Sequence, residues 1–216
     1  MNGEQGNPIE YRQLDMESLK GLAHPLRVAI LDTLATYGQF TASGLAERLG
    51  ESSGATSYHL RQLEKHGFVR EVAGRGTGRE RWWERVPVGL NLNSTELPDS
   101  PANRAITKTV LREWERSRST LLADFQERGF DVLDKEWIAA TNTATVNIRL
   151  TRDQLKQISE AWDAFIDPFI MKFRGQNAVG SRPVQIHFNA FPVLDGDETI
   201  EQSSTETTSD DVGGSA

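Results

Sequence analysis

Side chains that could read DNA bases recur at helical spacing between Ser53 and His66. One face of the predicted helix carries small and hydrogen-bonding residues, namely Ala55, Tyr58, His59 and Gln62. The opposite stripe consists of Thr56, Leu60 and Leu63. A helix that enters a DNA major groove needs this division, because one side must anchor it while the other reaches the base edges. Taken alone, the segment fits a recognition helix and an ordinary surface helix equally well.

A second short helix is expected directly upstream, over residues 41–50. Thr41 is a good N-cap for it and Gly50 a good left-handed stop. Its apolar residues have the spacing of a buried face: Ala42, Leu45, Ala46 and Leu49. A tight turn then leads to the capping serine Ser53, and two helices joined in this way are the helix-turn-helix signature. An apolar helix over residues 25–34, with proline in its first turn, is predicted to support the pair.

Two strands joined by a glycine-rich loop are predicted after the second helix. Residues 68–72 and 80–86 have strand-like composition, and three of the seven residues between them are glycines. Arg75 and Arg79 place positive charge on this loop. A helix-turn-helix followed by a basic hairpin is a winged helix, whose wing contacts phosphate or the minor groove. A nucleotide-binding loop is disfavoured, because a phosphate cradle leads into a helix and this loop leads into a strand.

The predicted DNA contacts come from the turn, the recognition helix and the wing. They are Thr41, Ser52, Ser53, Ala55, Ser57, Tyr58, His59, Arg61, Gln62, Lys65, Arg75, Thr77, Arg79 and Arg81. The chain has a net charge of −7, but residues 194–216 hold seven acidic residues and no Lys or Arg, so the rest is neutral. Residues 52–86 contain seven basic and four acidic side chains. Because this excess is modest, we expect the affinity to depend on a dimer that doubles the phosphate contacts.

Three motifs in combination resemble the winged-helix repressors of the arsenic-repressor (ArsR) type. They are Leu22-Ala-His-Pro-Leu-Arg27, the Ser57-x-His59-Leu60 step and Gly67-Phe-Val69. The resemblance covers roughly residues 15 to 86. It implies a homodimer that places two recognition helices, each containing Ser57, Tyr58 and His59, in successive major grooves. The Arg-Glu-Arg-Trp-Trp run at 79–83 resembles the wing of related regulators that carry an added C-terminal domain.

The fold class expected for the whole chain is α+β. The predicted parts are a flexible N-terminus over 1–14, the winged helix-turn-helix over 15–86, a linker over 87–102, a long helix over 103–129, a C-terminal α/β domain over 130–193 and a disordered acidic tail over 194–216. The long helix spans about 40 Å, more than one small domain buries, and is therefore the predicted dimerisation element. Alternating apolar residues predict strands over 145–150 and 182–191, on either side of a helix capped by Thr151, which together form a β-α-β unit.

No cofactor, metal or catalytic centre is expected. The chain has no cysteine, which excludes the thiolate sites used by metal-sensing repressors, and its four histidines show no paired ligand spacing. No catalytic triad, phosphate loop or pair of catalytic carboxylates is evident, so an enzyme is not expected. No apolar run approaches the roughly 18–20 residues of a membrane span. We therefore expect a cytoplasmic protein without membrane contact.

The function predicted from the sequence is a sequence-specific regulator of transcription that binds double-stranded DNA, most simply as a dimeric repressor. A protein-interaction adaptor that uses the winged helix without DNA is one alternative. A sensor for an unknown small-molecule effector is another, since five aromatic residues could line an apolar pocket: Trp114, Trp137, Trp162, Phe165 and Phe169. Aromatic residues at helical spacing more often form a plain hydrophobic core.

Overall fold

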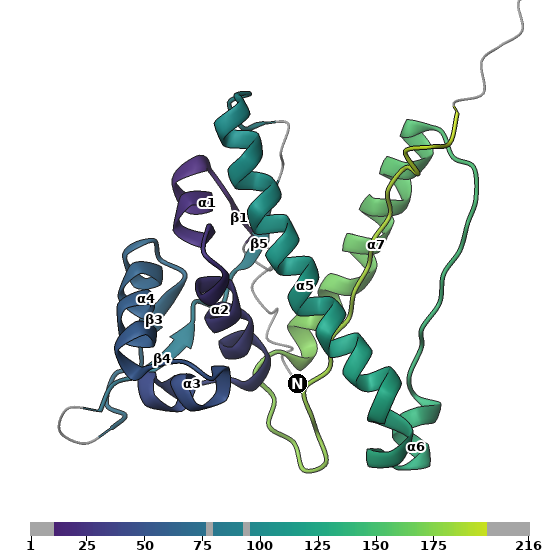
Figure 1. The fold of residues 1–216 in the computed structure, drawn as a ribbon. Coiled ribbons are helices and arrows are strands. Elements are labelled where there is room, and N and C mark those ends of the chain that lie inside the picture. Colours follow the sequence, from purple (N-terminus) through teal and green to yellow (C-terminus); the bar gives the residue numbers. More distant parts are fainter. Residues whose placement is uncertain (1–10, 77–79, 93–95, 198–216) are drawn as a thin grey trace, which may run out of the picture.

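The computed structural model describes residues 11–76, 80–92 and 96–197 (Figure 1). It confirms the α+β class and the winged helix-turn-helix at the N-terminal end. The elements are β1 Tyr11–Gln13, α1 Met16–Leu22, α2 Pro25–Tyr37, β2 Phe40–Thr41, α3 Ala42–Leu49, α4 Ser53–Lys65, β3 Val69–Glu71, β4 Trp82–Arg85, β5 Gly89–Asn91, α5 Pro101–Val132, α6 Lys135–Ala139 and α7 Arg152–Phe173.

Local capping explains where the two helices of the helix-turn-helix begin and end. The Thr41 side chain accepts a backbone amide hydrogen bond at 3.0 Å and begins α3, and Gly50 ends it in the left-handed conformation at φ 69°. Ser53, predicted to cap α4, is instead the first residue of that helix. The cap is Ser52, whose hydroxyl accepts a backbone amide hydrogen bond at 3.1 Å. Either serine offers the same chemistry, so the backbone geometry of the turn decides between them.

The wing is a three-stranded antiparallel sheet in the order β2-β4-β3. Phe40 pairs with Trp83 and Val69 pairs with Arg85, so the short strand before α3 completes the sheet. A second ladder, which sequence reasoning did not predict, joins β1 to β5 in parallel. It ties the segment before α1 to the segment after the wing, and so closes the winged helix at both ends of its sequence.

One hydrophobic core holds the winged helix together and extends onto α5. Its buried members are Leu14, Leu19, Leu22, Ile30, Leu31, Leu34, Leu45, Leu60, Leu63, Phe68, Val69, Trp83 and Val110. Inside this core the Thr56 hydroxyl donates to the Ala42 carbonyl at 2.8 Å, which ties α4 to α3. Val110 fixes the N-terminal part of α5 against the core, and the helix then continues well past it (Figure 1). None of the described helices combines the length and the apolar character needed to cross a membrane.

The C-terminal arm, defined as residues 133–197, differs from its prediction. The predicted helix is present as α7 and begins with a capping box between Thr151 and Gln154. The two flanking segments, 145–150 and 182–191, were predicted as strands but pair with no strand among the described residues. Apolar alternation gives a segment the pattern of a strand, whereas a ladder also needs a neighbouring strand beside it. The β-α-β unit is therefore represented only by its helix and two extended segments.

Candidate nucleic-acid interface

The exposed face of α4 is rotated by about one residue from the predicted one. Tyr58 is 56% exposed, and Arg61 and Lys65 are also exposed on this side of the helix. Thr56, Leu60 and Leu63 form the buried side as predicted. The exposed stripe therefore follows the spacing of Ser57, Tyr58, Arg61 and Lys65, in place of the predicted spacing of Ala55, Tyr58, His59 and Gln62.

His59 was predicted on the DNA-reading face, and this prediction is wrong. Its side chain is only 9% exposed and packs against His24, the N-cap residue of α2, with the two ring centroids 4.2 Å apart. Its Nδ1 is buried, and among the described residues it has no hydrogen-bond partner. Desolvation by burial, followed by the nearby His24 and Arg27, lowers the pKa of His59. His59 is therefore a neutral packing residue that supports the recognition helix from behind.

A concave groove gathers several predicted contact residues from three elements. It lies between the beginning of α3, the outer face of α4 and the base of the wing, with a volume of about 680 Å³. The predicted residues that line it are Thr41, Ser53, Ser57, Arg61 and Arg81. Three hydroxyls and two guanidinium groups thus meet at one surface, beside the backbone amides at the start of α3. This combination of donors suits phosphate oxygens and base edges.

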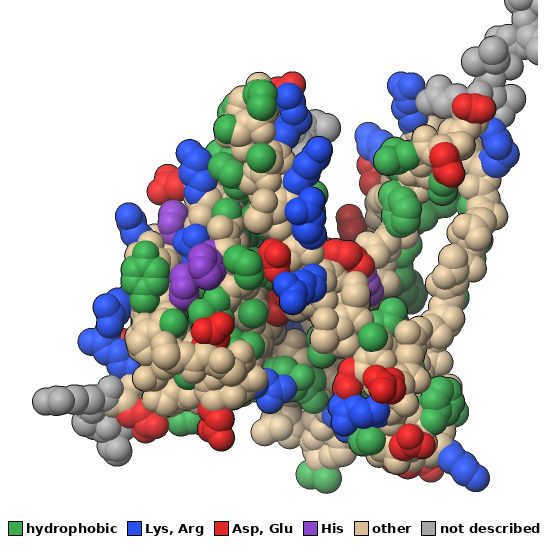
Figure 2. Space-filling view, viewed as in Figure 1, with side chains coloured by type: hydrophobic (Ala, Val, Ile, Leu, Met, Phe, Trp, Pro, Cys, Tyr) green, Lys and Arg blue, Asp and Glu red, His purple; other side chains and the backbone are tan. Residues whose placement is uncertain are grey.

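The charge of this groove is positive but not uniformly so. Glu80 also lines it, and Arg81 forms an exposed ion pair with Glu71 at 3.5 Å. Exposed pairs of this kind contribute little to stability, so Arg81 can exchange Glu71 for a phosphate at a small cost. Lys and Arg side chains lie along the edge of the molecule formed by α4 and the wing (Figure 2).

The described part of the wing holds Arg75 against aromatic surface. Its guanidinium carbon lies 3.7 Å from the ring centroid of Trp82, and the side chain also donates to Gln39. Arg70 and Glu84 face each other across β3 and β4 at 2.7 Å. This hydrogen bond from Arg70, and a second one from Gln39, lower the pKa of Glu84. Arg75 therefore has intramolecular partners in Trp82 and Gln39. The sequence had indicated only that Arg75 places positive charge on the loop.

The remaining predicted contacts divide into three groups. Ser52 uses its hydroxyl to cap α4. Ala55 and Gln62 are half-buried at the edge of the exposed stripe. Thr77 and Arg79, the predicted contacts at the tip of the wing, lie outside the described residues.

A polar network that sequence reasoning missed connects the wing to α5. Asp32 of α2 lies near Ser117 and Arg118 of α5 and near Arg85 of β4. Burial raises the pKa of Asp32, although Ser117 and the two arginines act in the opposite direction. Burial likewise lowers the pKa of Arg85, and Asp32 opposes that shift. The sequence had suggested only that Arg85 adds basic charge to the wing.

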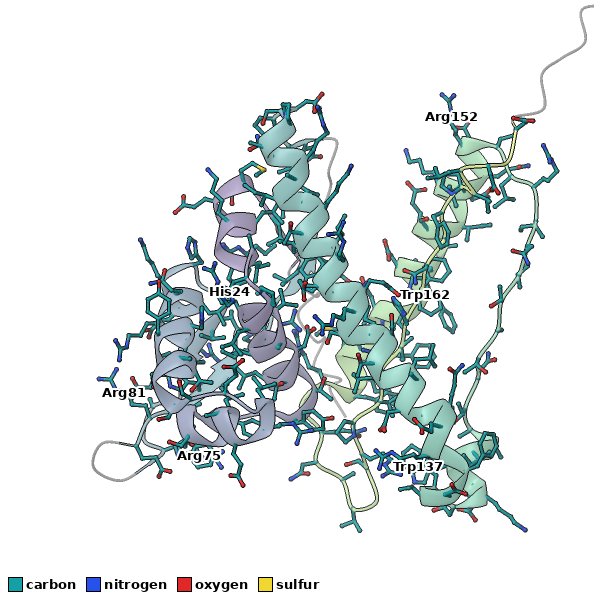
Figure 3. All side chains as sticks on the ribbon, viewed as in Figure 1. His24, Arg75, Arg81, Trp137, Arg152 and Trp162 are labelled. Carbon is teal, nitrogen blue, oxygen red and sulfur yellow. The ribbon has the colours of Figure 1, made fainter. Side chains whose placement is uncertain are left out.

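The arm does not assemble the predicted aromatic pocket. Trp162 stacks on Phe188 with ring centroids 4.6 Å apart, whereas Trp137 has the Arg182 guanidinium 5.4 Å from its ring. Trp137 and Trp162 lie at different levels of the arm (Figure 3), so the five aromatic residues do not line one cavity. Within residues 11–76, 80–92 and 96–197, no three His, Asp or Glu side chains are grouped so that they could hold a metal ion.

The comparison with protein families agrees with this geometry. Residues 22–72 match a family model described as a helix-turn-helix domain, which covers the segment from the end of α1 to the wing. No curated protein matches the chain significantly.

Solved structures with a related arrangement include bacterial regulators. Reduced HlyU from Vibrio cholerae is 23% identical and covers 44% of this chain and 83% of its own, with a TM-score of 0.28. A possible transcriptional regulator for arsenical resistance is 22% identical and covers 60% of this chain and 99% of its own, with a TM-score of 0.28. A mutant of ZitR from Lactococcus lactis in its apo form is 18% identical and covers 68% and 83%, with a TM-score of 0.31.

These structural overlaps are loose, so the class of the protein follows from the helix-turn-helix match and from the chain's own geometry. A helix-turn-helix with an antiparallel wing, and a groove of hydroxyl and guanidinium donors beside its second helix, are the parts of a winged helix-turn-helix regulator. They support a DNA-binding transcriptional regulator as the class of this protein.

Proposed function

We propose that the protein is a sequence-specific, cytoplasmic transcriptional regulator that binds double-stranded DNA as a homodimer and represses by occluding RNA polymerase. In this proposal α4 enters the major groove, and the beginning of α3 and the wing hold the adjacent backbone. Control by thiolate-bound metal has no place in it, because the chain contains no cysteine.

The groove between α3, α4 and the wing is the observation that carries the proposal. Arg61 and Arg81 project from two elements toward one surface, and Thr41, Ser53 and Ser57 add hydroxyls between them. Phosphate contacts from several elements fix the register of a helix in the major groove, which leaves the exposed Tyr58 to contact bases.

Dimerisation is supported by the part of α5 that the core leaves uncovered. Beyond Val110, the large apolar side chains Leu111, Leu122 and Phe130 are exposed. Pairing of two α5 helices would bury them and would set the separation of the two recognition helices. Successive major grooves on one side of DNA are about 34 Å apart, so two α4 helices at this spacing would read a pseudo-palindromic operator.

The test is to select bound fragments of genomic DNA with the purified full chain and then to footprint the enriched site. We expect two protected half-sites about 10 base pairs apart. The logarithm of the binding constant should fall linearly with the logarithm of the salt concentration. Transcription from a promoter carrying this site should decrease when the protein is added.

Three results would each contradict a part of the proposal. An enriched pool without a common motif would refute sequence-specific recognition. The absence of any salt-dependent binding to DNA would instead favour the adaptor, which uses the same fold for protein contacts. Increased transcription from the occupied site would refute repression while leaving DNA binding intact.

A further inference from the structure

No side chain among residues 133–197 of the arm is buried. No residue of α6 or α7 is buried, although α7 carries a clear apolar stripe. Among the described residues, every exposed large hydrophobic side chain other than Tyr11, Tyr37 and Tyr58 lies beyond residue 110. Hydrophobic groups can be seen along α7 on one side of the molecule (Figure 2). A helix with this pattern needs a surface to cover it, and the described residues leave much of its apolar stripe uncovered.

The two extended segments that flank α7 in the sequence have strand patterns but pair with no strand among the described residues. Segment 182–191 places Phe188 against Trp162 of α7, while the neighbouring His187 faces α5, with its Nε2 4.0 Å from Glu115. Alternate residues thus point to opposite sides, as they do in a β-strand. The two sides of the segment meet helices of the same chain, so its backbone edges are the part available to a further strand.

We propose that residues 145–150 and 182–191 become β-strands in a dimer, in which a second copy of this chain supplies neighbouring strands and covers the aromatic face of α7. The interface rests on the homodimer proposed above and extends it from α5 to the arm. In an isologous interface, an edge strand lies antiparallel to the same strand of the second copy. Two antiparallel strands can form a regular ladder of backbone hydrogen bonds.

The exposed area is large enough for such an interface. With about 200 Å² for a fully exposed phenylalanine, Phe165, Phe169 and Phe173 together expose on the order of 300 Å². Val146 at 74%, Val184 at 67% and Ile186 at 61% are also exposed on the two flanking segments. The total approaches the roughly 800 Å² that each partner of a stable complex buries.

The charge of this region favours a second copy over a strongly charged partner. Residues 141–197 contain six Lys or Arg and six Asp or Glu side chains, so two copies meet without net repulsion. Phe130 and Leu122 of α5, the proposed dimerisation helix, are exposed as well. Both observations fit a single interface shared by α5 and the arm.

The first test is hydrogen–deuterium exchange on the full chain without DNA, at concentrations above and below its dimer dissociation constant measured by sedimentation. We expect the amides of residues 145–150 and 182–191 to exchange slowly in the dimer and rapidly after dilution. Rapid exchange of both segments in a verified dimer would overturn the inference, and so would a parent chain that stays monomeric at all concentrations.

The second test compares Ile186→Asp with Gln185→Asp, a matched change at the adjacent residue on the opposite side of the segment. A carboxylate at position 186 would be buried unpaired in the dimer, so we expect self-association to weaken about 100-fold, with little change for Gln185→Asp. Dimerisation of Ile186→Asp at the parent's affinity would refute the interface. Because all of these measurements omit DNA, a failure of operator binding would refute the proposed function and leave this interface standing.

Discussion

Replacing Arg61 with alanine should make DNA binding less sensitive to salt. Arg61 is exposed on α4 and lines the groove beside Ser53 and Ser57, at a distance from the hydrophobic core. Its loss should therefore leave the fold intact and remove one cationic contact from each protomer. The expected effect is electrostatic, because a guanidinium in this position neutralises a phosphate and releases the counterions around it.

The size of this effect follows from the number of contacts. Each neutralised phosphate contributes about 0.9 to the slope of log K against log salt concentration, so a dimer that loses two contacts should lose about 1.8 from its slope. When the salt concentration rises tenfold, the ratio of the parent's affinity to that of Arg61→Ala should therefore fall by about 60-fold. Fluorescence anisotropy with one labelled operator, measured at five or six salt concentrations, resolves a change of this size.

The matched control is Arg128→Ala, which removes the same charge from the far end of α5. Arg128 pairs there with Asp124 at 2.6 Å and lies outside the groove. Its slope should equal that of the parent. Equal slopes for the parent and Arg61→Ala, or an equal loss in Arg128→Ala, would refute the placement of Arg61 on the DNA backbone.

Three further predictions concern the recognition helix and its support. Tyr58→Ala should reduce discrimination between operator and mismatched DNA by about 1–3 kcal/mol, whereas non-specific binding in a competition assay should change little. Thr56→Val should lower the free energy of unfolding in urea by about 1–3 kcal/mol, because it leaves the Ala42 carbonyl without this buried donor. An unchanged transition midpoint would contradict this. Because the pKa of His59 is lowered in the folded state, the unfolded chain protonates this histidine at a higher pH than the folded chain does. The free energy of unfolding should therefore fall as the pH drops below about 6.5 toward that lowered pKa. This stabilisation is fully present above pH 6.5, and His59→Phe should flatten the pH dependence in urea titrations between pH 5 and 7.

The helix-turn-helix could be predicted because its determinants are local. Thr41 and Gly50 act within one turn of the residues they cap, and the apolar spacing of α3 and α4 alone defines their buried sides. The wing strands follow from similarly short-range patterns. The groove residues Ser57, Arg61 and Arg81 were accessible to the same reasoning, because each lies on an element whose start and direction the sequence defines.

The placement of His59 could not be predicted, because it depends on a distant residue. Its position on the helix suggested the polar face, but the His24 ring occupies the space opposite it and holds it inside. The β1–β5 ladder was missed for the same reason, since it pairs Tyr11 with Gly89 across most of the winged-helix sequence. The alternation in 182–191 predicted a strand, but no strand pairs with this segment among the described residues, because a periodic pattern does not identify the neighbouring strand.

The Asp32 network gives the proposed dimer a means of setting the geometry of its DNA-binding surface. Asp32 belongs to α2, which packs behind the recognition helix, while Arg85 ends the wing and Ser117 lies on the proposed dimerisation helix. Asp32 and Arg85 each favour the charged form of the other, so this cluster favours one relative arrangement of the three elements. The cluster therefore favours one direction of α5 relative to its own winged helix. Pairing of two α5 helices then determines the separation of the two α4 helices, and with it the half-site spacing that the operator must have.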